Sequence, residues 1–376
     1  MTKTIEDLIP DYLRGLPMYV PGRPIEDVER ELKIVAIKVA SNENPLGPSP
    51  MAMEAVKGAL GEANRYPDGG THRLREKLAK LHGVHEDEIF VGLGSSELID
   101  LAARVLLRSG KSGVTSEGSY APFSIAIRAN NAELRLAPLR EFTFDLRAIA
   151  AKVTGDTAVI YLANPNNPTG TAFGHAEFAE LLARVPESVL VVLDEAYVHY
   201  ADRVDMPRSM ELTRERKNLL VLRTFSKVYG LAGLRMGYGV GPRALVTAMN
   251  KLRTPFNVSG LGQVAAVAAL NDAEHVRRSI EANRAERNGL HEGLTALGLR
   301  PVRSETNFIF IEIGPEANAI SEELLRLGVI VRPLGWMGMA EALRVSVGTA
   351  EENGKLLNAL ALVCERRAGK SELASR

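Results

Sequence analysis

Apolar runs of strand length alternate with helical patterns of apolar residues along the first two thirds of the chain. The strand-length runs span residues 89–91, 158–163, 189–193 and 219–223. Helical spacing occurs at residues 51–64, 72–82, 97–108, 176–185 and 242–252. Strands that are apolar throughout and are separated by helices are typical of a parallel sheet covered on both faces. This pattern predicts a large α/β unit with a mostly parallel central sheet between helices.

The pattern changes after about residue 260. A long helical region at 262–297 precedes strand-like segments at 307–313, 329–332 and 343–347 and helical segments at 319–327 and 351–367. These elements predict a smaller α+β domain. We therefore expect three parts: an N-terminal segment of residues 1–45 that packs with the small domain, a large domain of residues 46–260, and residues 261–376, which form a long linking helix and the small domain.

Composition and charge exclude several classes of protein. The 46 basic and 46 acidic residues cancel, so no net field attracts nucleic acid or an anionic membrane. The single cysteine, Cys364, cannot form an intramolecular disulfide, and no Cys/His cluster indicates a metal site. The N-terminus carries acids and a proline where a signal peptide needs an apolar core, and no stretch approaches the roughly 20 apolar residues of a membrane span. We expect a cytoplasmic protein with no metal, nucleic-acid or membrane partner.

Four motifs follow predicted strands, and the first is a candidate phosphate site. Residues 91–97 read Val-Gly-Leu-Gly-Ser-Ser-Glu and open a helix. The N–H groups and positive dipole end of a helix start bind anions, and Ser95 and Ser96 add hydroxyl donors. A plain turn with a serine cap explains the segment equally well. Glu97 stands where the dinucleotide fingerprint requires glycine, so that fingerprint is excluded.

The second motif is a turn at residues 164–170, Asn-Pro-Asn-Asn-Pro-Thr-Gly. Two prolines and a glycine make the turn rigid, and it follows the strand-like run that ends at Ala163. Open α/β sheets bind ligands at this carboxyl edge of their strands. Asn167, directly before Pro168, is therefore a candidate ligand contact.

The third motif is Val-Val-Leu-Asp-Glu-Ala-Tyr at residues 191–197. Asp194 follows three apolar residues, so its carboxylate should be partly buried at the sheet edge and should meet a cation. A metal-binding acid or a helix cap are alternatives. The chain contains no GxxxxGK[ST] loop, which argues against a nucleotide hydrolase.

The fourth motif, residues 224–235, places Lys227 in a loop rich in hydroxyls and glycine at the same edge. Most lysines are solvated surface charges, but Thr224, Ser226 and Arg235 form a second set of anion-binding groups beside this one. One phosphorylated ligand that bonds covalently to a lysine accounts for all four motifs together.

These residues resemble the fold-type I, aspartate-aminotransferase-like enzymes that depend on pyridoxal phosphate. The matching residues, in chain order, are Asn167, Asp194, Tyr197, Ser226, Lys227, Arg235 and Arg344. The finer resemblance is to histidinol-phosphate aminotransferases, at residues 18–22, 41–48, 65–68, 164–170, 224–235 and 343–348. The chain departs from that family at Ser96, where aspartate is usual, and at residues 119–123, Ser-Tyr-Ala-Pro-Phe.

The resemblance implies a role in cofactor binding for each matching residue. Lys227 bonds to the cofactor aldehyde and moves the proton during the reaction, and Asp194 pairs with the pyridine nitrogen. Asn167 and Tyr197 contact the phenolic oxygen, and Tyr120 stacks on the ring. The phosphate contacts are Ser95, Ser96, Thr224, Ser226 and Arg235, with Tyr66 supplied by the neighbouring subunit of a homodimer with shared active sites.

The resemblance also implies the substrates. Arg344 binds the anionic group of the amino donor or the phosphate of the substrate, and Tyr19, Asn44, Asn307 and Arg332 line the same pocket. The implied reaction converts L-histidinol phosphate and 2-oxoglutarate to imidazole-acetol phosphate and L-glutamate, a step of histidine biosynthesis. An aromatic amino acid aminotransferase with phenylalanine or tyrosine as substrate is the alternative. A decarboxylase of phosphorylated amino acids and a non-catalytic regulator fit the sequence less well.

Overall fold

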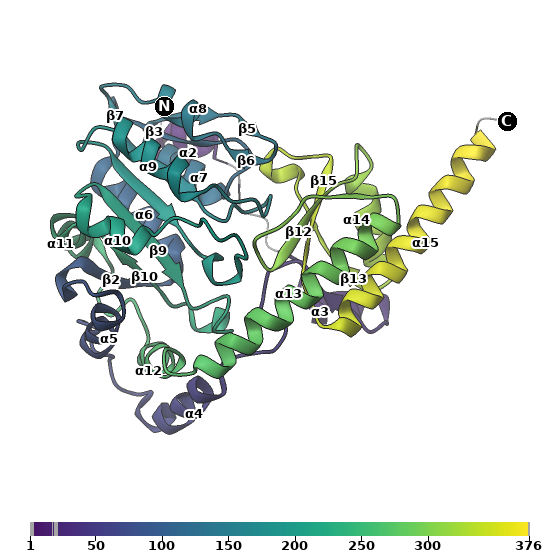
Figure 1. Ribbon diagram of the computed structural model, residues 1–376, viewed down its shortest axis with the longest axis horizontal. Helices are drawn as coiled ribbons and strands as arrows, with labels where there is room; N and C mark the ends of the chain where they lie inside the picture. The colour runs from purple at the N-terminus through teal and green to yellow at the C-terminus, as the bar shows by residue number, and fades with distance from the viewer. Residues whose placement is uncertain (1–3, 17, 19–21, 375–376) are drawn as a thin grey trace.

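The computed structural model describes residues 4–16, 18 and 22–374, with only the backbone described for residues 368–374. Its elements form a large and a small part joined by one long helix, α13 (Ala273–Ala296) (Figure 1). In the described part of the chain, no helix is both long enough and apolar enough to cross a membrane.

The large part is built on a seven-stranded sheet with the strand order β2-β10-β9-β8-β7-β3-β4. The strands are β2 (Ile89–Gly92), β3 (Ser112–Ser116), β4 (Glu133–Ala137), β7 (Thr157–Ala163), β8 (Leu190–Asp194), β9 (Leu219–Thr224) and β10 (Gly237–Val240). Neighbouring strands from β9 to β4 are parallel, whereas β10 is antiparallel to both of its neighbours. Every residue of β7 and β8 is buried, so both faces of the sheet are covered. The predicted fold class is confirmed.

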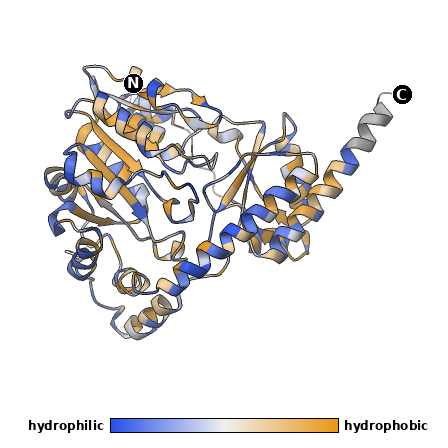
Figure 2. Ribbon diagram, viewed as in Figure 1, coloured by the Kyte–Doolittle hydropathy of each residue, from blue (hydrophilic) through white to orange (hydrophobic). Residues whose placement is uncertain are grey.

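Helices pack around this sheet (Figure 1). They are α5 (His72–His82), α6 (Gly94–Leu106), α7 (Ala121–Ala129), α8 (Leu146–Ala151), α9 (His175–Arg184), α10 (Ser209–Glu215), α11 (Arg243–Leu252) and α12 (Gly260–Ala269). A further helix, α4 (Pro50–Ala59), packs on α12. The orange strands in Figure 2 show that the apolar residues gather on the central sheet, while blue polar residues line the outer sides of the helices.

The small part has a four-stranded antiparallel sheet with the order β11-β12-β15-β14. Its elements are β11 (Arg300–Pro301), β12 (Phe308–Glu312), α14 (Ala317–Arg326), β14 (Arg332–Pro333), β15 (Ala342–Ser346) and α15 (Ala350–Ala374). The N-terminal strand β1 (Ile37–Lys38) pairs in parallel with β13 (Val329–Ile330) and so lies beside this part. Earlier in the chain, α2 (Asp11–Arg14) instead contacts α7 of the large part (Figure 1).

The helical region predicted at 262–297 is two helices, α12 and α13, with a break at residues 270–272. Asp272 caps the start of α13, because its carboxylate accepts the backbone N–H of His275 at 3.2 Å. The same carboxylate accepts the Ser49 hydroxyl at 2.6 Å, which fixes α4 against the start of α13.

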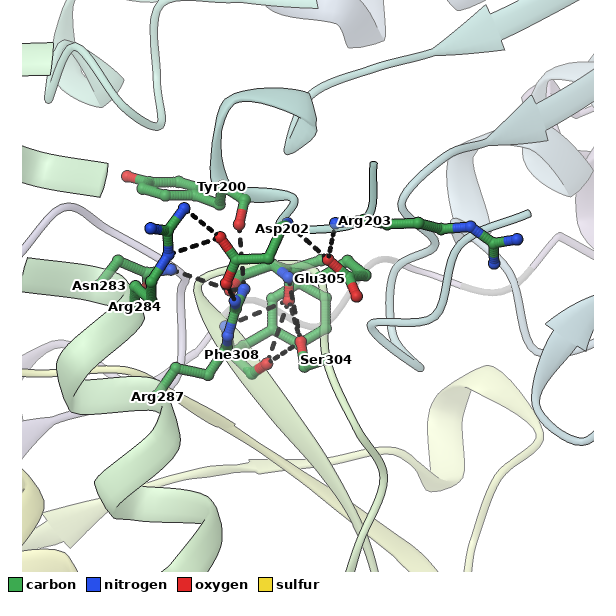
Figure 3. Close-up of polar contacts among 10 residues, drawn as sticks. Tyr200, Asp202, Arg203, Asn283, Arg284, Arg287, Ser304, Glu305 and Phe308 are labelled. Carbon is green, nitrogen blue, oxygen red and sulfur yellow. Dashed lines mark hydrogen bonds and ion pairs between the residues drawn. The ribbon is translucent and has the colours of Figure 1, made fainter. Parts of the chain in front are cut away.

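A polar junction joins the two parts where α13 passes the loop after β8 (Figure 3). The buried Arg287 donates to the carbonyl oxygens of Tyr200 at 3.1 Å and Thr306 at 2.9 Å, and its guanidinium pairs with Asp202. The Glu305 carboxylate accepts the backbone N–H of Asp202 at 2.7 Å. The loop just before β12 is thereby held on the large part.

Candidate active site

A cavity of about 260 Å³ opens between the two parts, at the carboxyl edge of the central sheet. It collects twelve of the residues predicted from the sequence: Ser95, Ser96, Tyr120, Asn167, Asp194, Tyr197, Thr224, Ser226, Lys227, Arg235, Arg332 and Arg344. These residues come together because β7, β8 and β9 are parallel and end at one edge, while β14 and β15 of the small part form the opposite wall.

Lys227 places its amine inside this cavity. Its Nζ donates to the carbonyl oxygens of Asn42 at 3.1 Å and Ser41 at 3.5 Å. It also lies 5.4 Å from the centre of the Tyr197 ring. Carbonyl oxygens and an aromatic face leave the amine nitrogen accessible from the cavity, as a nucleophile requires.

Asp194 supplies a buried negative charge below the cavity, with 4% of its surface exposed. Burial raises the pKa of its carboxyl to about 6, although hydrogen bonds from the Ser95 hydroxyl and the Ala196 N–H act in the opposite direction. The Ala196 bond is 3.0 Å long. A buried carboxyl with a pKa raised toward neutral pH is suited to pairing with a cation that enters the cavity.

The start of α6 and the loop after β9 form a cradle for an anion. Gly94 has a φ of 76°, and a Cβ built on it would lie 3.1 Å from the guanidinium of Arg235. Thr224 and Ser226 face the same region, with the Ser226 N–H donating to the Thr224 hydroxyl at 3.0 Å. The Ser96 hydroxyl lies 3.0 Å from the Tyr120 hydroxyl. Helix-start N–H groups, hydroxyls and one guanidinium are the donors that phosphate binding requires.

Two arginines form the wall contributed by the small part. Arg332 and Arg344 are register partners on β14 and β15, and both are buried. Arg344 donates to the Asn167 side-chain oxygen at 2.6 Å and to the Ala40 carbonyl at 2.7 Å. Arg332 lies over the Trp336 ring at 4.8 Å.

Other predicted residues lie elsewhere. Asn44 donates to the Val228 carbonyl and the Ser279 hydroxyl, both at 2.9 Å, and does not line the cavity. Asn307 lies behind the cavity wall, where it donates to the Asn42 carbonyl at 3.1 Å. Tyr66 is 84% exposed and stacks on Phe256, away from the cavity of its own chain. Tyr19 is outside the described residues.

The prediction from sequence missed part of the cavity wall, namely Ala40, Ser41, Asn42 and Glu43. Asn42 is buried and has a φ of 56°. Asparagine is among the few residues that tolerate this left-handed conformation, and this tolerance is the signal that the sequence offered.

Comparison with known proteins places this geometry in a family. Residues 34–360 match the sequence profile of the aminotransferases of class I and II. The chain belongs to this family. It is 45% identical to histidinol-phosphate aminotransferase 2 of Pseudomonas fluorescens, over 94% of this chain and 96% of that protein. The Pseudomonas aeruginosa protein of the same name is also 45% identical, over 93% and 96% of the two chains.

Solved structures of class I and II aminotransferases have the same fold. Histidinol-phosphate aminotransferase from Sinorhizobium meliloti, in complex with pyridoxal-5′-phosphate, superposes with a TM-score of 0.88 at 30% identity, covering 95% of this chain and 98% of that one. The aspartate aminotransferase of Thermus thermophilus with maleate gives a TM-score of 0.82 at 22% identity, which shows the fold alone.

The residues of the cavity fit pyridoxal phosphate, the cofactor of this family. Lys227 offers an amine for the aldehyde, and the cradle of α6 with Arg235 offers donors for the phosphate. Asp194 is a buried carboxyl whose pKa is raised to about 6 by burial, and it would pair with the protonated pyridine nitrogen. Each polar part of the cofactor therefore has a matching group in the cavity.

Proposed function

We propose that this protein uses pyridoxal phosphate to transfer the amino group of L-histidinol phosphate to 2-oxoglutarate, in histidine biosynthesis. The observation that carries the proposal is the pair of buried arginines, Arg332 and Arg344, that face the Lys227 amine across one cavity. The names and high identity of the relatives support the choice of substrate.

Two guanidinium groups on adjacent strands suit the substrates of both half-reactions. The phosphate of histidinol phosphate carries close to two negative charges at neutral pH, and 2-oxoglutarate carries two carboxylates. A guanidinium binds either group through two parallel hydrogen bonds, so one site serves both substrates in turn. Asn167 and Ala40 hold the Arg344 guanidinium in place for this role.

The other residues act on the cofactor and on the proton. When bound, pyridoxal phosphate supplies an electron-withdrawing ring that stabilises negative charge at the substrate carbon. Asp194 would keep a proton on the ring nitrogen, and Asn167 and Tyr197 would contact the phenolic oxygen. Tyr120 would stack on the ring face, and Ser95, Ser96, Thr224, Ser226 and Arg235 would hold the phosphate. Lys227 would take the proton from the substrate carbon and deliver it to C4′, the cofactor carbon that carried the aldehyde.

We also propose a cytoplasmic homodimer with shared active sites. Tyr66 and Phe256 support this, because their rings stack with centroids 4.8 Å apart while 84% and 47% of their surfaces are exposed. Exposed stacked rings are a common feature of protein interfaces, and Tyr66 would reach the phosphate bound in the partner.

The alternative is an aromatic aminotransferase. Apolar rings at the arginines favour it, since Arg344 lies 5.2 Å from the Phe308 ring and Arg332 lies over Trp336. Rapid mixing of the holoenzyme with L-histidinol phosphate and, separately, with L-phenylalanine distinguishes the two. We expect the visible absorbance of the bound cofactor to change faster with histidinol phosphate. A faster change with phenylalanine would establish the alternative.

A further inference from the structure

Asn42 has more contacts with active-site groups than its place in a loop suggests. Its side chain is 1% exposed, and its backbone carbonyl accepts Lys227 and Asn307, each at 3.1 Å. Its backbone N–H donates to the Ser346 hydroxyl at 2.8 Å. A left-handed φ of 56° is needed to turn the carbonyl toward the lysine and the N–H toward the small part.

These contacts fix the orientation of the Asn42 amide. The Ser346 hydroxyl accepts the Asn42 N–H and therefore has its own proton available for the Asn42 side-chain oxygen, 2.9 Å away. With the amide oxygen held there, the amide nitrogen faces the Tyr197 hydroxyl at 3.0 Å. An NH2 group only donates, so the Tyr197 oxygen is the acceptor.

The Tyr197 hydroxyl must then use its own proton in another direction. No hydrogen bond among the described residues uses that proton, and Tyr197 lines the cavity. Ser346 lies two residues after Arg344, so both side chains project from the same face of β15. Arg344 binds the Ala40 carbonyl and Ser346 binds Asn42, which joins this strand to the segment that orients Tyr197.

We propose that Asn42 is a positioning residue: its amide directs the Tyr197 proton into the cavity, and Ser346 ties that direction to the strand that carries Arg344. The inference rests on the proposed function, because the acceptor of the proton is the phenolic oxygen of pyridoxal phosphate. A hydrogen bond to that oxygen stabilises its anionic form and lowers the pH at which the bound cofactor loses its proton.

The test is a pH titration of the visible absorbance of the holoenzyme. Asn42→Gly keeps the left-handed backbone accessible and removes the amide without adding a charge. We expect the midpoint of the titration to rise by about one pH unit, the size expected for a weakened hydrogen bond to a charged oxygen. Ser346→Ala keeps Asn42 but frees its amide to rotate, so we expect a smaller rise of the titration midpoint. This variant also tests the inference if Asn42→Gly folds poorly.

Tyr197→Phe supplies the control, because Asn42 is proposed to act through that hydroxyl. In the Tyr197→Phe protein, Asn42→Gly should cause no further shift. The titratable and charged groups that line the cavity are unchanged in the Asn42 and Ser346 variants: Glu43, Tyr120, Asp194, Tyr197, Lys227, Arg235, Arg332 and Arg344. An unshifted midpoint in Asn42→Gly, or a full shift in the Tyr197→Phe background, refutes the inference.

The titration also separates this inference from the proposed function. If the parent binds pyridoxal phosphate but does not turn over histidinol phosphate, a shifted midpoint in Asn42→Gly upholds the positioning role, and only the substrate is wrong. If the parent does not bind pyridoxal phosphate at all, both the proposed function and the role of Asn42 are refuted.

Discussion

Replacing Asp194 with asparagine should make the cofactor-free protein more stable and the enzyme much slower. In the cofactor-free protein, burial raises the pKa of this carboxyl from 3.8 to about 6. The difference of roughly 2 units corresponds to about 3 kcal/mol, which is the cost of keeping the buried carboxylate ionised even with the hydrogen bonds from Ser95 and Ala196. Asparagine keeps the shape and removes this cost.

The sign of the effect sets its pH dependence. The folded protein holds the Asp194 proton more tightly than the unfolded chain, so the carboxyl costs no stability below about pH 4 and an increasing amount as the pH rises through 6. We expect Asp194→Asn to raise the melting temperature of the cofactor-free protein at pH 8 and to leave it unchanged near pH 4. Bound cofactor should abolish the advantage, because its protonated ring nitrogen pairs with the carboxylate of the parent.

Turnover should fall in the Asp194→Asn variant. The ion pair between Asp194 and the ring nitrogen must offset at least the cost of about 3 kcal/mol for ionising the carboxylate. Loss of this ion pair in the transition state therefore lowers kcat by more than about 100-fold. Thermal unfolding of the cofactor-free proteins at two pH values, together with steady-state kinetics, measures both effects. Asp87→Asn, at an exposed carboxylate, is the matched control. A variant no more stable than the parent at pH 8, or one that keeps kcat within tenfold, would show that Asp194 has been misassigned.

Three further experiments test the phosphate contact, the junction between the two parts and the sharing of active sites. Arg332→Ala should raise KM for histidinol phosphate at least tenfold and raise KM for phenylalanine less, because only histidinol phosphate carries a phosphate. Equal increases in the two KM values would argue against a phosphate contact at Arg332. Arg287→Ala removes the buried ion-pair partner of Asp202 and the hydrogen bonds to the Tyr200 and Thr306 carbonyls, and should cost about 3 kcal/mol in thermal unfolding. Arg284→Ala, at a more exposed partner of the same carboxylate, should cost under about 1 kcal/mol, and similar losses in the two variants would contradict the proposed importance of the junction. Equal amounts of Tyr66→Ala and Lys227→Ala proteins, mixed to allow subunit exchange, should reach up to about a quarter of the parent activity, because about half of the dimers are then mixed and each mixed dimer has one intact site of two. No recovery after verified subunit exchange would contradict shared sites.

The carboxyl edge of the sheet was predictable from the sequence because the reactive residues lie at, or shortly after, the ends of largely apolar strands. Lys227 and Asp194 are the clearest cases, since β8 and β9 are apolar almost throughout and place the residues that follow them at one edge. The order of polar residues at the strand ends was then sufficient to predict most of the cavity lining.

Other strands were missed because glycine replaces the apolar signal where elements pack closely. In β3, a Cβ at Gly113 would lie 2.6 Å from the side chain of Ile127 on α7. In β10, a Cβ at Gly237 would lie 2.7 Å from the backbone of Gly94. Both glycines permit the close approach, and both make the strand look polar or turn-like in the sequence.

The polar wall between the two parts was the least predictable region. Asn42 and Asn44 have the same side chain in the same motif, but Asn42 contacts Tyr197 and Ser346, whereas Asn44 supports Val228 and Ser279. These contacts join segments far apart in the chain, so a local sequence pattern does not distinguish the role of Asn42 from that of Asn44. The predicted boundaries at residues 45/46 and 260/261 stay predictions, as do the roles of individual site residues.

The rapid-mixing experiment with the holoenzyme tests the central claim most directly. We expect L-histidinol phosphate to remove the visible absorbance of the bound cofactor within one turnover and 2-oxoglutarate to restore it. L-phenylalanine should remove the absorbance more slowly. Histidinol phosphate that leaves the absorbance unchanged, while phenylalanine discharges it, would contradict the account and would assign the two arginines to carboxylate binding alone.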